Sequence, residues 1–236
     1  MNIFWHGQSC FQIIASRGKN NQVSIIIDPF DETLGLRVPK LEADILLVSH
    51  NHCDYNNVKA VSPSTGSGQA PFLISGPGEY EIKDVFVQGI SSFHDSSQGK
   101  ERGQNTIYTI DSEDFRLCHL GDFGQKELTE EQLEKIGEVD ILMIPIGGVY
   151  LPDLPSATRR QAGTISAEEA LKIMAQIEPK ITIPMHYQIP KLKLKLDSLD
   201  KFLKNLGIKS IESLAKLSIK KKDLSEEEAK IIVLKP

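Results

Sequence analysis

The sequence has few of the features that mark secreted, membrane-spanning or DNA-coating proteins. Only three cysteines occur in 236 residues, which excludes a disulfide framework and makes a reducing cytoplasm the expected location. Apolar runs such as ILLV at 45–48 and ILMI at 141–144 fall far short of the ~20 residues that span a bilayer. The first residues also lack the basic and apolar regions of a secretory signal. No membrane partner is therefore expected.

An excess of basic charge is also missing. There are 32 acidic and 27 basic residues, which give a net charge of -5. Proteins that bind duplex DNA draw most of their affinity from neutralising its phosphates, so this net charge makes such binding unlikely for the chain as a whole. Residues 189–222 are the exception, with ten lysines and three acids, a local net charge of +7. Phe202 is the only aromatic residue among these lysines, so base stacking is not supported. We therefore expect a small-molecule substrate, and nucleic acid remains an alternative partner.

Composition and local pattern predict one globular α/β (α+β) domain over residues 1–236. Hydrophobic residues make up 40% and charged residues 25% of the chain, which is ordinary for a folded protein. Short β-branched and aliphatic runs bounded by Gly, Pro, Asn or Asp predict many strands, the first two pairing as a hairpin across residues 7–9. Thr129 with Gln132 and Ser166 with Glu169 form capping-box patterns, which predict two helix starts.

The lysine-rich C-terminal part, residues 189–236, is predicted to hold a further helix and strands. Apolar residues recur at helical spacing over about 197–206, and Gly207 follows as a stop signal. The run KLKLKL at 191–196 alternates strictly, which predicts a lysine-guarded edge strand or an extended arm. A last strand is expected over 231–234. Oligomeric state cannot be read from these patterns.

One motif carries most of the chemistry. His50, His52 and Asp54 follow directly on the apolar run 45–48, which reads as a strand. In an extended chain these alternate residues point the same way, and α/β sheets commonly place ligands at the carboxyl ends of strands. Imidazole nitrogens and a carboxylate are ligands that zinc accepts. The motif therefore predicts part of a metal site.

Three other predicted strands also end in a residue of the metal-ligating type. His94 follows the strand from residue 85, Asp122 follows the strand from residue 115, and His186 follows the strand from residue 181. Each alone is weak, because a single His or Asp after a strand is common in turns. Together with the motif at 50–54 they give four strands that end in such residues, and we expect them to share one metal centre.

These residues resemble the metallo-β-lactamase-fold hydrolases, in particular the branch similar to ascorbate-phosphate lactonases. The resemblance covers about residues 1–190. Its motifs are WHGQSCF (5–11), IDP (27–29), the His50/His52/Asp54 element, SGPGEYE (75–81), GQNTIY (103–108), HLGD (119–122), IPIGG (144–148) and IPMHY (183–187). It implies a four-layer αβ/βα sandwich with a metal centre at one edge of two sheets.

The resemblance also implies a ligand set for one or two divalent metal ions, zinc first, with manganese or iron as alternatives. By position, His50, His52 and His94 match the ligands of the first metal. Asp54 and His186 match ligands of the second metal, and Asp122 matches the carboxylate that bridges the two. Two positions depart from the pattern. Tyr55 stands where the family has a histidine, which puts the second metal in question, and Gln8 stands where many relatives have one, with His6 two residues earlier.

The expected activity is hydrolysis of an ester, lactone or phosphodiester by a metal-bound hydroxide, with Asp54 as the catalytic carboxylate that positions it. The substrate is unidentified. Arg159 and Arg160 in the long loop 147–165 are candidates for holding an anionic group, although solvated arginines are the commoner case. Two alternatives stay open: an RNA- or nucleotide-processing nuclease or phosphodiesterase, and a non-catalytic metal-binding module. His119 is expected to have a structural role near the centre.

Overall fold

Two large β-sheets form the body of the protein. The computed structural model describes residues 1–236 except 19–20, 53–55, 65–67, 149–162 and 226–227. The six-stranded sheet has the spatial order β15 (Leu217–Ser218), β1 (Asn2–Gly7), β2 (Cys10–Arg17), β3 (Asn21–Ile27), β5 (Ile45–Leu47) and β7 (Phe72–Ile74). The seven-stranded sheet has the order β16 (Lys230–Ile231), β13 (Ile181–Met185), β12 (Ile141–Pro145), β11 (Phe115–His119), β10 (Gln104–Ser112), β9 (Val85–Phe93) and β8 (Gly78–Ile82).

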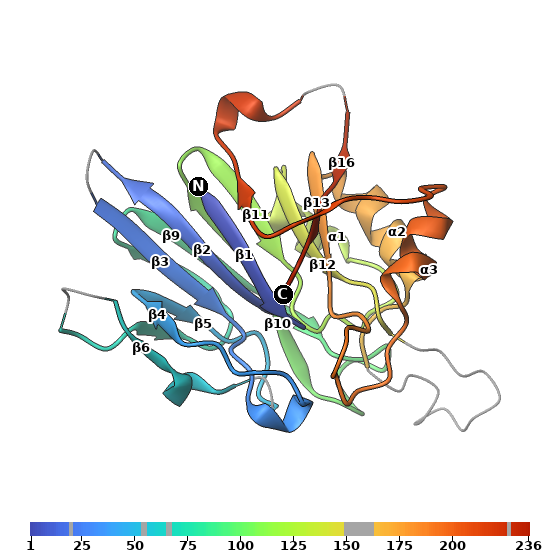
Figure 1. Cartoon of the computed structure of the whole chain (residues 1–236), viewed down its shortest axis with the longest axis horizontal. Helices are drawn as coiled ribbons and strands as arrows, with labels where there is room; N and C mark the ends of the chain where they lie inside the picture. Colours follow the sequence, from blue (N-terminus) through green and yellow to red (C-terminus); the bar gives the residue numbers. More distant parts are fainter. Residues whose placement is uncertain (19–20, 53–55, 65–67, 149–162, 226–227) are drawn as a thin grey trace.

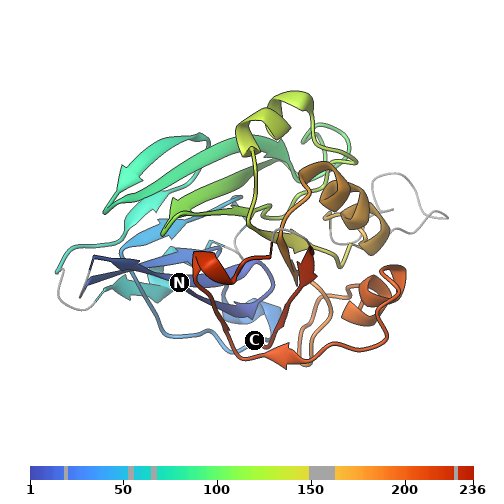
Figure 2. The same cartoon turned by 90° about the horizontal axis from the view of Figure 1, so that it is seen from above.

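The two sheets lie face to face, as the predicted sandwich requires. Seen from above, the strands of β9–β11 form one layer and those of β1–β3 the layer beneath it (Figure 2). Alternate side chains of β1 and β2, among them Ile3, Trp5 and Ile13, are fully or almost fully buried in the shared hydrophobic core. Two small sheets complete the strands: β4 (Leu41–Ala43) with β6 (Val61–Pro63), and β14 (Ser213–Leu214) with β17 (Val233–Leu234).

The α-helices begin where the sequence predicts. Thr129 caps α1 (Glu130–Ile136) and Ser166 caps α2 (Ala167–Ile177), each in a complete capping box. The third predicted helix is α3 (Leu199–Asn205), which buries Phe202 and Leu203. α1 packs against β9 and α2, and α2 packs against α3, so these helices lie beside the seven-stranded sheet (Figures 1 and 2).

Strand direction brings the carboxyl ends of several strands from both sheets to the same edge of the sandwich. β3 and β5 are parallel neighbours in one sheet, and β11, β12 and β13 are parallel neighbours in the other. β1 is antiparallel to β2, which is antiparallel to β3, so β1 runs in the same direction as β3. In the same way β9 runs in the direction of β11, because both are antiparallel to β10. The residues that follow β3, β5, β9, β11 and β13 therefore collect at one place between the sheets.

Tyr108 ties the two sheets together next to that edge. Its ring is buried on β10, and its hydroxyl donates to the carbonyl of Val48, 2.8 Å away, and accepts from the backbone N–H of Gly76 at 3.0 Å. The backbone N–H of Thr106 also donates to the Ser49 carbonyl, at 2.7 Å. These links fix the chain after β5 against the opposite sheet.

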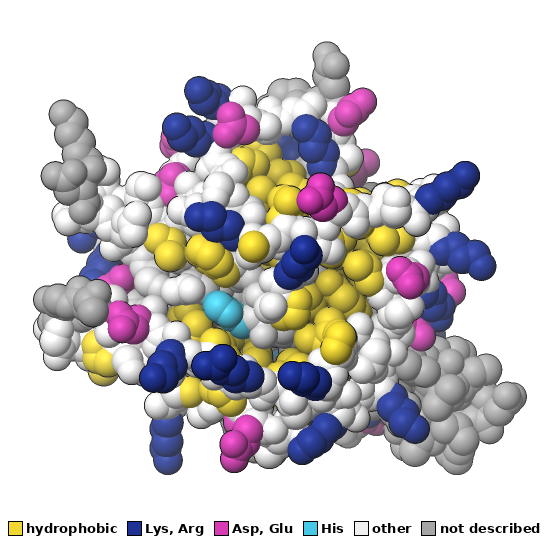
Figure 3. Space-filling model, viewed as in Figure 1, with side chains coloured by type: hydrophobic (Ala, Val, Ile, Leu, Met, Phe, Trp, Pro, Cys, Tyr) yellow, Lys and Arg dark blue, Asp and Glu magenta, His cyan; other side chains and the backbone are white. Residues whose placement is uncertain are grey.

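The C-terminal part decides between the two alternatives predicted for one run and corrects the prediction for another. The run 191–196 is an extended arm and not an edge strand: Leu192 and Leu196 are buried while the lysines between them are exposed, and Lys193 donates its backbone N–H to Leu34. The predicted strand over 231–234 is interrupted, because β16 joins the seven-stranded sheet and β17 joins β14. On the face shown in Figure 3, basic side chains surround a broad apolar surface, and several of them lie in a row along its lower part. No helix among the described residues is long and apolar enough to cross a membrane.

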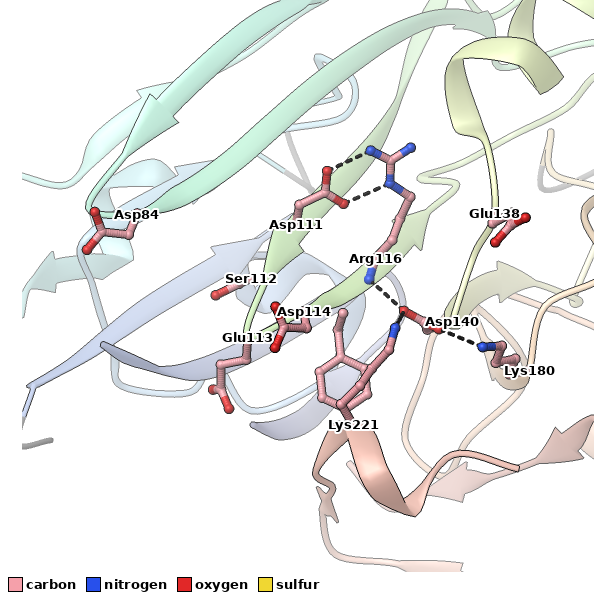
Figure 4. Close-up of a pocket in the computed structure, with 11 residues that line it drawn as sticks. Asp84, Asp111, Ser112, Glu113, Asp114, Arg116, Glu138, Asp140, Lys180 and Lys221 are labelled. Atoms are coloured by element: carbon pink, nitrogen blue, oxygen red, sulfur yellow. Dashed lines mark hydrogen bonds and ion pairs between the residues drawn. The ribbon is translucent and has the colours of Figure 1, made fainter. Parts of the chain in front are cut away.

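Asp140 holds the C-terminal segment against the end of the sandwich opposite the strand ends described above. Its carboxylate forms ion pairs with the ammonium groups of Lys221, 2.6 Å away, and Lys180, 3.5 Å away, and it accepts the backbone N–H of Arg116 at 2.9 Å (Figure 4). Burial opposes ionisation of Asp140, but these partners hold its pKa below the usual range. One buried carboxylate thus joins β11, β12 and the segment around residue 221.

We expect Asp140→Asn to lower the free energy of unfolding by about 1 kcal/mol at pH 7, a modest value because both lysines are partly exposed. Because folding lowers the pKa of Asp140, the ionised side chain stabilises the folded protein at pH values above its unfolded pKa of about 3.9. This stabilisation is lost as the pH falls through the pKa of the folded state. Urea unfolding of both proteins at pH 7, 4 and 3 checks this. Glu131→Gln, which removes an exposed pair with Lys135, is the control and should change nothing measurable.

Candidate metal centre

Three imidazoles meet at the edge where the strands end. His50 and His52 follow β5, and His94 follows β9. Each of the three rings has one nitrogen that lies within 4.8 Å of a nitrogen of each of the other two rings. The ring centroids are 4.9 Å apart for His50 and His52, 5.1 Å for His50 and His94, and 4.8 Å for His52 and His94. His50 and His94 are buried and His52 is half-buried, so the cluster is open on one side.

Asp122 adds a carboxylate to this cluster and brings in His186. Its Oδ2 atom lies 3.5 Å from Nε2 of His50, 3.4 Å from Nε2 of His94 and 3.5 Å from Nε2 of His186. These separations exceed an ordinary N–H···O hydrogen bond of about 2.7–3.2 Å. They are close to the edge of a tetrahedron around zinc, about 3.3 Å for bonds of about 2.0–2.1 Å. The donor set therefore fits a divalent metal ion.

Charge states in the cluster also suit a metal. Burial lowers the pKa of His50 to about 3, so its ring is neutral at pH 7 and keeps a lone pair. Burial opposes ionisation of Asp122, but His186, His50 and His94 around it hold its pKa well below the usual range. Metal ligands of these types bind as neutral imidazole and as carboxylate.

A hydrogen-bonded chain behind His50 fixes which ring nitrogen faces the cluster. The Ser49 hydroxyl lies 2.9 Å from Nδ1 of His50 and donates to Asp28 at 2.6 Å, while the Ser49 N–H donates to the same carboxylate at 2.7 Å. The Ser49 hydroxyl therefore links Nδ1 of His50 to Asp28. Because Nδ1 is engaged behind the ring, Nε2 is the nitrogen that faces Asp122, 3.5 Å from its Oδ2 atom.

Asp28 is unusual in both conformation and ionisation. It follows β3 with a φ of 47°, in the left-handed region that non-glycine residues rarely adopt. The side chain is completely buried, which raises its pKa to about 8 despite the two hydrogen bonds from Ser49. His186 has a similar φ of 51° at the end of β13. Strained backbone of this kind gathers at functional sites.

A second set of hydrogen bonds positions Asp122. The Ser9 hydroxyl donates to Oδ1 of Asp122 at 2.8 Å, which leaves Oδ2 directed at the three imidazoles. The Asn105 side chain accepts the backbone N–H of Asp122 at 3.0 Å and donates to the Leu120 carbonyl at 2.9 Å. His119 accepts the Gly121 N–H on Nδ1 and so donates from Nε2 to the Ser9 carbonyl, 2.9 Å away.

Gly121 makes this packing possible. A Cβ at this position would lie 2.4 Å from Oδ1 of Asn105 and 2.6 Å from Oγ of Ser49, and its φ is 60°. Only glycine allows both the turn and the close approach. The residues behind the cluster come from the β1–β2 turn, from the positions that follow β3 and β5, and from β10.

Of the six residues predicted as ligands, the structure brings five together: His50, His52, His94, Asp122 and His186. Asp54 and Tyr55 lie outside the described residues, as do Arg159 and Arg160. His6 is not in the cluster; it is half-buried on β1 and bonds to Gln12. Gln8 is fully buried at the β1–β2 turn, and its carbonyl accepts the N–H of His186 at 3.2 Å.

The supporting residues Ser9, Asp28, Ser49 and Asn105 were not predicted to have a role. Ser9, Asp28 and Asn105 stand in three of the motifs that carry the family resemblance, WHGQSCF, IDP and GQNTIY, and this was the signal that could have indicated them. Ser49 gives no signal of its own, because a single serine next to a strand is common.

Comparison with known proteins identifies the family. The family model described as a β-lactamase superfamily domain matches residues 2–186. A UPF0173 metal-dependent hydrolase of Thermoplasma volcanium is 31% identical over 210 residues, which is 79% of this chain and 83% of that protein. The chain therefore belongs to the metallo-β-lactamase superfamily, and it is a metal-dependent hydrolase of that fold.

Solved structures agree with the fold. A crystal structure of a candidate Zn-dependent hydrolase of this superfamily from Thermotoga maritima is 29% identical, with a TM-score of 0.72, covering 99% of this chain and 97% of that one. An isothiocyanate hydrolase from Delia radicum gut bacteria has a TM-score of 0.67 at 12% identity, covering 93% of this chain and 99% of that one, which shows the shared fold alone. The lactonase-like branch stays a prediction.

We expect the protein to bind zinc, and His94→Ala or Asp122→Asn to weaken that binding by more than the 10–100-fold typical of a change behind a ligand. Competition with a chromophoric chelator measures the affinity, and zinc should also raise the unfolding temperature of the wild type by linkage. His6→Gln, a change outside the cluster, is the control. Unchanged zinc affinity in both cluster variants would show that the metal binds elsewhere.

Ser49→Ala is predicted to lower zinc affinity about 10–100-fold although Ser49 is not a candidate ligand, because it removes the hydroxyl that links Nδ1 of His50 to Asp28. Ser218→Ala removes an exposed hydroxyl that bonds to Asn2 at the far end of β1 and is the matched control. The same chelator competition measures both proteins. Equal affinities for the two variants would rule out this role for Ser49.

Proposed function

We propose that this protein hydrolyses an ester, lactone or phosphodiester bond of a small molecule at the cluster of His50, His52, His94 and Asp122. The observation that carries the proposal is the position of Asp122, whose carboxylate oxygen lies 3.4–3.5 Å from three imidazole nitrogens at an open edge of the sandwich. Buried charges in proteins are paired or coordinate metal ions, and a buried carboxylate among three imidazoles is suited to hold a cation.

In this proposal the first metal is held by His50, His52, His94 and Asp122, and Asp122 also faces a second position with His186. Zinc is the first choice because imidazole nitrogens dominate the donor set, and manganese and iron are the alternatives. When bound, such a metal supplies a Lewis acid and lowers the pKa of water to about 7. Asp54 stays the proposed catalytic carboxylate by its place in the motif.

The residues around the cluster support hydrolysis of a small molecule. A cavity of about 510 Å³ opens beside His50 and His52, which is within the range for small-molecule sites. Asn51, Asn56 and Thr106 are among the residues that line it, so it offers amide and hydroxyl groups that can orient a polar substrate. Buried Asp28 and Ser49 hold His50 still while the substrate is positioned.

A cytoplasmic location remains part of the proposal, on the basis of the cysteine content. Cys10 and Cys118, both buried, are free thiols. Burial raises the pKa of both thiols, so neither is poised for redox chemistry.

The experiment is a screen of esters, lactones and phosphodiesters with zinc-, manganese- and iron-loaded protein, together with Asp122→Asn. We expect at least one bond type to be cleaved, and kcat/KM in the variant to fall at least about 10³-fold, or about 4 kcal/mol. His6→Gln should keep the wild-type rate. Absence of hydrolysis with every metal would contradict the proposal, and RNA cleavage with binding that falls steeply with salt would favour the nuclease alternative.

A further inference from the structure

His119 uses both of its ring nitrogens inside the protein, next to the candidate metal centre. It is the last residue of β11 and is completely buried, and its ring lies edge-on to that of Phe11 with the centroids 5.7 Å apart. Its Nδ1 atom accepts the backbone N–H of Gly121 at 3.1 Å, and its Nε2 atom lies 2.9 Å from the backbone carbonyl oxygen of Ser9. With both nitrogens engaged, this ring serves the structure around the centre and does not bind the metal.

These two partners fix where the ring carries its proton. A backbone N–H only donates, so Nδ1 of His119 carries no proton, and a backbone carbonyl only accepts, so Nε2 carries one. Burial agrees with this, because it lowers the pKa of His119 to about 4 and keeps the ring neutral at pH 7. His119 is therefore a neutral bridge with one defined tautomer.

The bridge joins two segments that both reach Asp122. Ser9, in the turn between β1 and β2, donates its hydroxyl to Oδ1 of Asp122 at 2.8 Å. Gly121 has a φ of 60°, so the chain turns immediately before the Asp122 carboxylate. The β1–β2 turn also accepts the backbone N–H of His186 on the Gln8 carbonyl at 3.2 Å. One turn therefore contacts both of the described residues that face the proposed second metal position.

Ser9 engages one oxygen of Asp122 and leaves the other for the cluster. Oδ1 accepts from the Ser9 hydroxyl, whereas Oδ2 lies 3.4–3.5 Å from three imidazole nitrogens. A carboxylate that can rotate is able to coordinate one ion through both oxygens, as carboxylates do at many metal sites. A carboxylate held at Oδ1 presents Oδ2 alone, so the Ser9 hydroxyl sets how Asp122 meets a metal.

We infer that His119 is a positioning residue for the metal centre: it holds the β1–β2 turn against the loop of Asp122, so that the Ser9 hydroxyl reaches Oδ1 and Oδ2 faces the imidazoles. His119 acts through Ser9 and contacts neither metal nor substrate. Partners behind metal ligands orient those ligands and change metal affinity about 10–100-fold. This inference rests on the metal centre of the proposed function, and it does not depend on which bond the protein cleaves.

Two conservative variants separate the two hydrogen bonds of His119. A Gln side chain can place its amide nitrogen where Nε2 lies and keep the bond to Ser9, whereas an Asn side chain can place its oxygen where Nδ1 lies and keep only the bond to Gly121. We expect His119→Asn to weaken zinc binding about tenfold and His119→Gln to stay within about threefold of the wild type. Competition with a chromophoric chelator measures these affinities.

A double-mutant cycle tests whether His119 acts through Ser9. Ser9→Ala removes the hydrogen bond to Oδ1 of Asp122 and should by itself weaken zinc binding about tenfold. Adding His119→Asn to Ser9→Ala should then weaken binding by less than about twofold more, because the hydroxyl that His119 positions is already absent. Two independent losses that add would contradict the inference, and so would equal zinc affinity in the wild type and both single variants.

Cobalt supplies a measurement that a loss of stability alone does not change. Co(II) bound in place of zinc absorbs visible light, and its absorbance falls as the number of coordinating atoms rises. We expect the same fall in Ser9→Ala and His119→Asn, where Asp122 can coordinate through both oxygens, and the wild-type spectrum in His119→Gln. Cys118→Ala changes the buried neighbour of His119 and is the matched control, which should lower the unfolding temperature and leave the spectrum unchanged. Wild-type spectra in Ser9→Ala and His119→Asn would overturn the inference.

Nitrogen NMR of the wild-type protein tests the bridge even if His119→Asn does not fold. In protein labelled with ¹⁵N-histidine, we expect the His119 ring at pH 7 to show a bare Nδ1 and a protonated Nε2, with zinc and without it. The opposite tautomer or a doubly protonated ring would overturn the inference. Zinc binding by the wild type that no variant changes would overturn it alone, whereas a wild type that binds no zinc would contradict the proposed function and this inference with it.

Discussion

The Asp122 carboxylate is the group on which the rest of this structure depends. It is buried where two sheets end, and it faces His50, His94 and His186 at equal separations of 3.4–3.5 Å. A charge in such a place costs several kcal/mol unless it is shared with another charge or bonded to donors. Ser9 and the neighbouring imidazoles supply part of that compensation, and in the proposed function a divalent cation would supply the remainder.

Strand direction explains how residues from distant parts of the chain reach Asp122. Parallel pairing of β3 with β5 and of β11 with β13 through β12 places the carboxyl ends of these strands at one edge. Tyr108 and the bond from Thr106 to Ser49 then fix the two sheets relative to each other beside the cluster. A site built on strand ends from two sheets keeps its ligands in place without help from long loops.

Much of this could be predicted from the sequence, because it depends on local pattern. The capping boxes at Thr129 and Ser166 and the polar residues that follow apolar strands are visible in a single sequence. The supporting residues are different, since Ser9 and Ser49 act through contacts with residues far away in the chain. The run 191–196 shows a further limit: its alternation fitted an edge strand or an extended arm equally, and only the structure shows an arm in which Leu192 and Leu196 are buried and Lys193 and Lys195 are exposed.

The most direct test of the account is the position of the metal. Crystals of the zinc-loaded protein, measured at the zinc absorption edge, should give an anomalous peak enclosed by His50, His52, His94 and Asp122, about 2.0–2.2 Å from their nearest nitrogen and oxygen atoms. A second, weaker peak between Asp122 and His186 would fit the same account. Zinc bound only at surface residues, with no peak among these histidines, would contradict it.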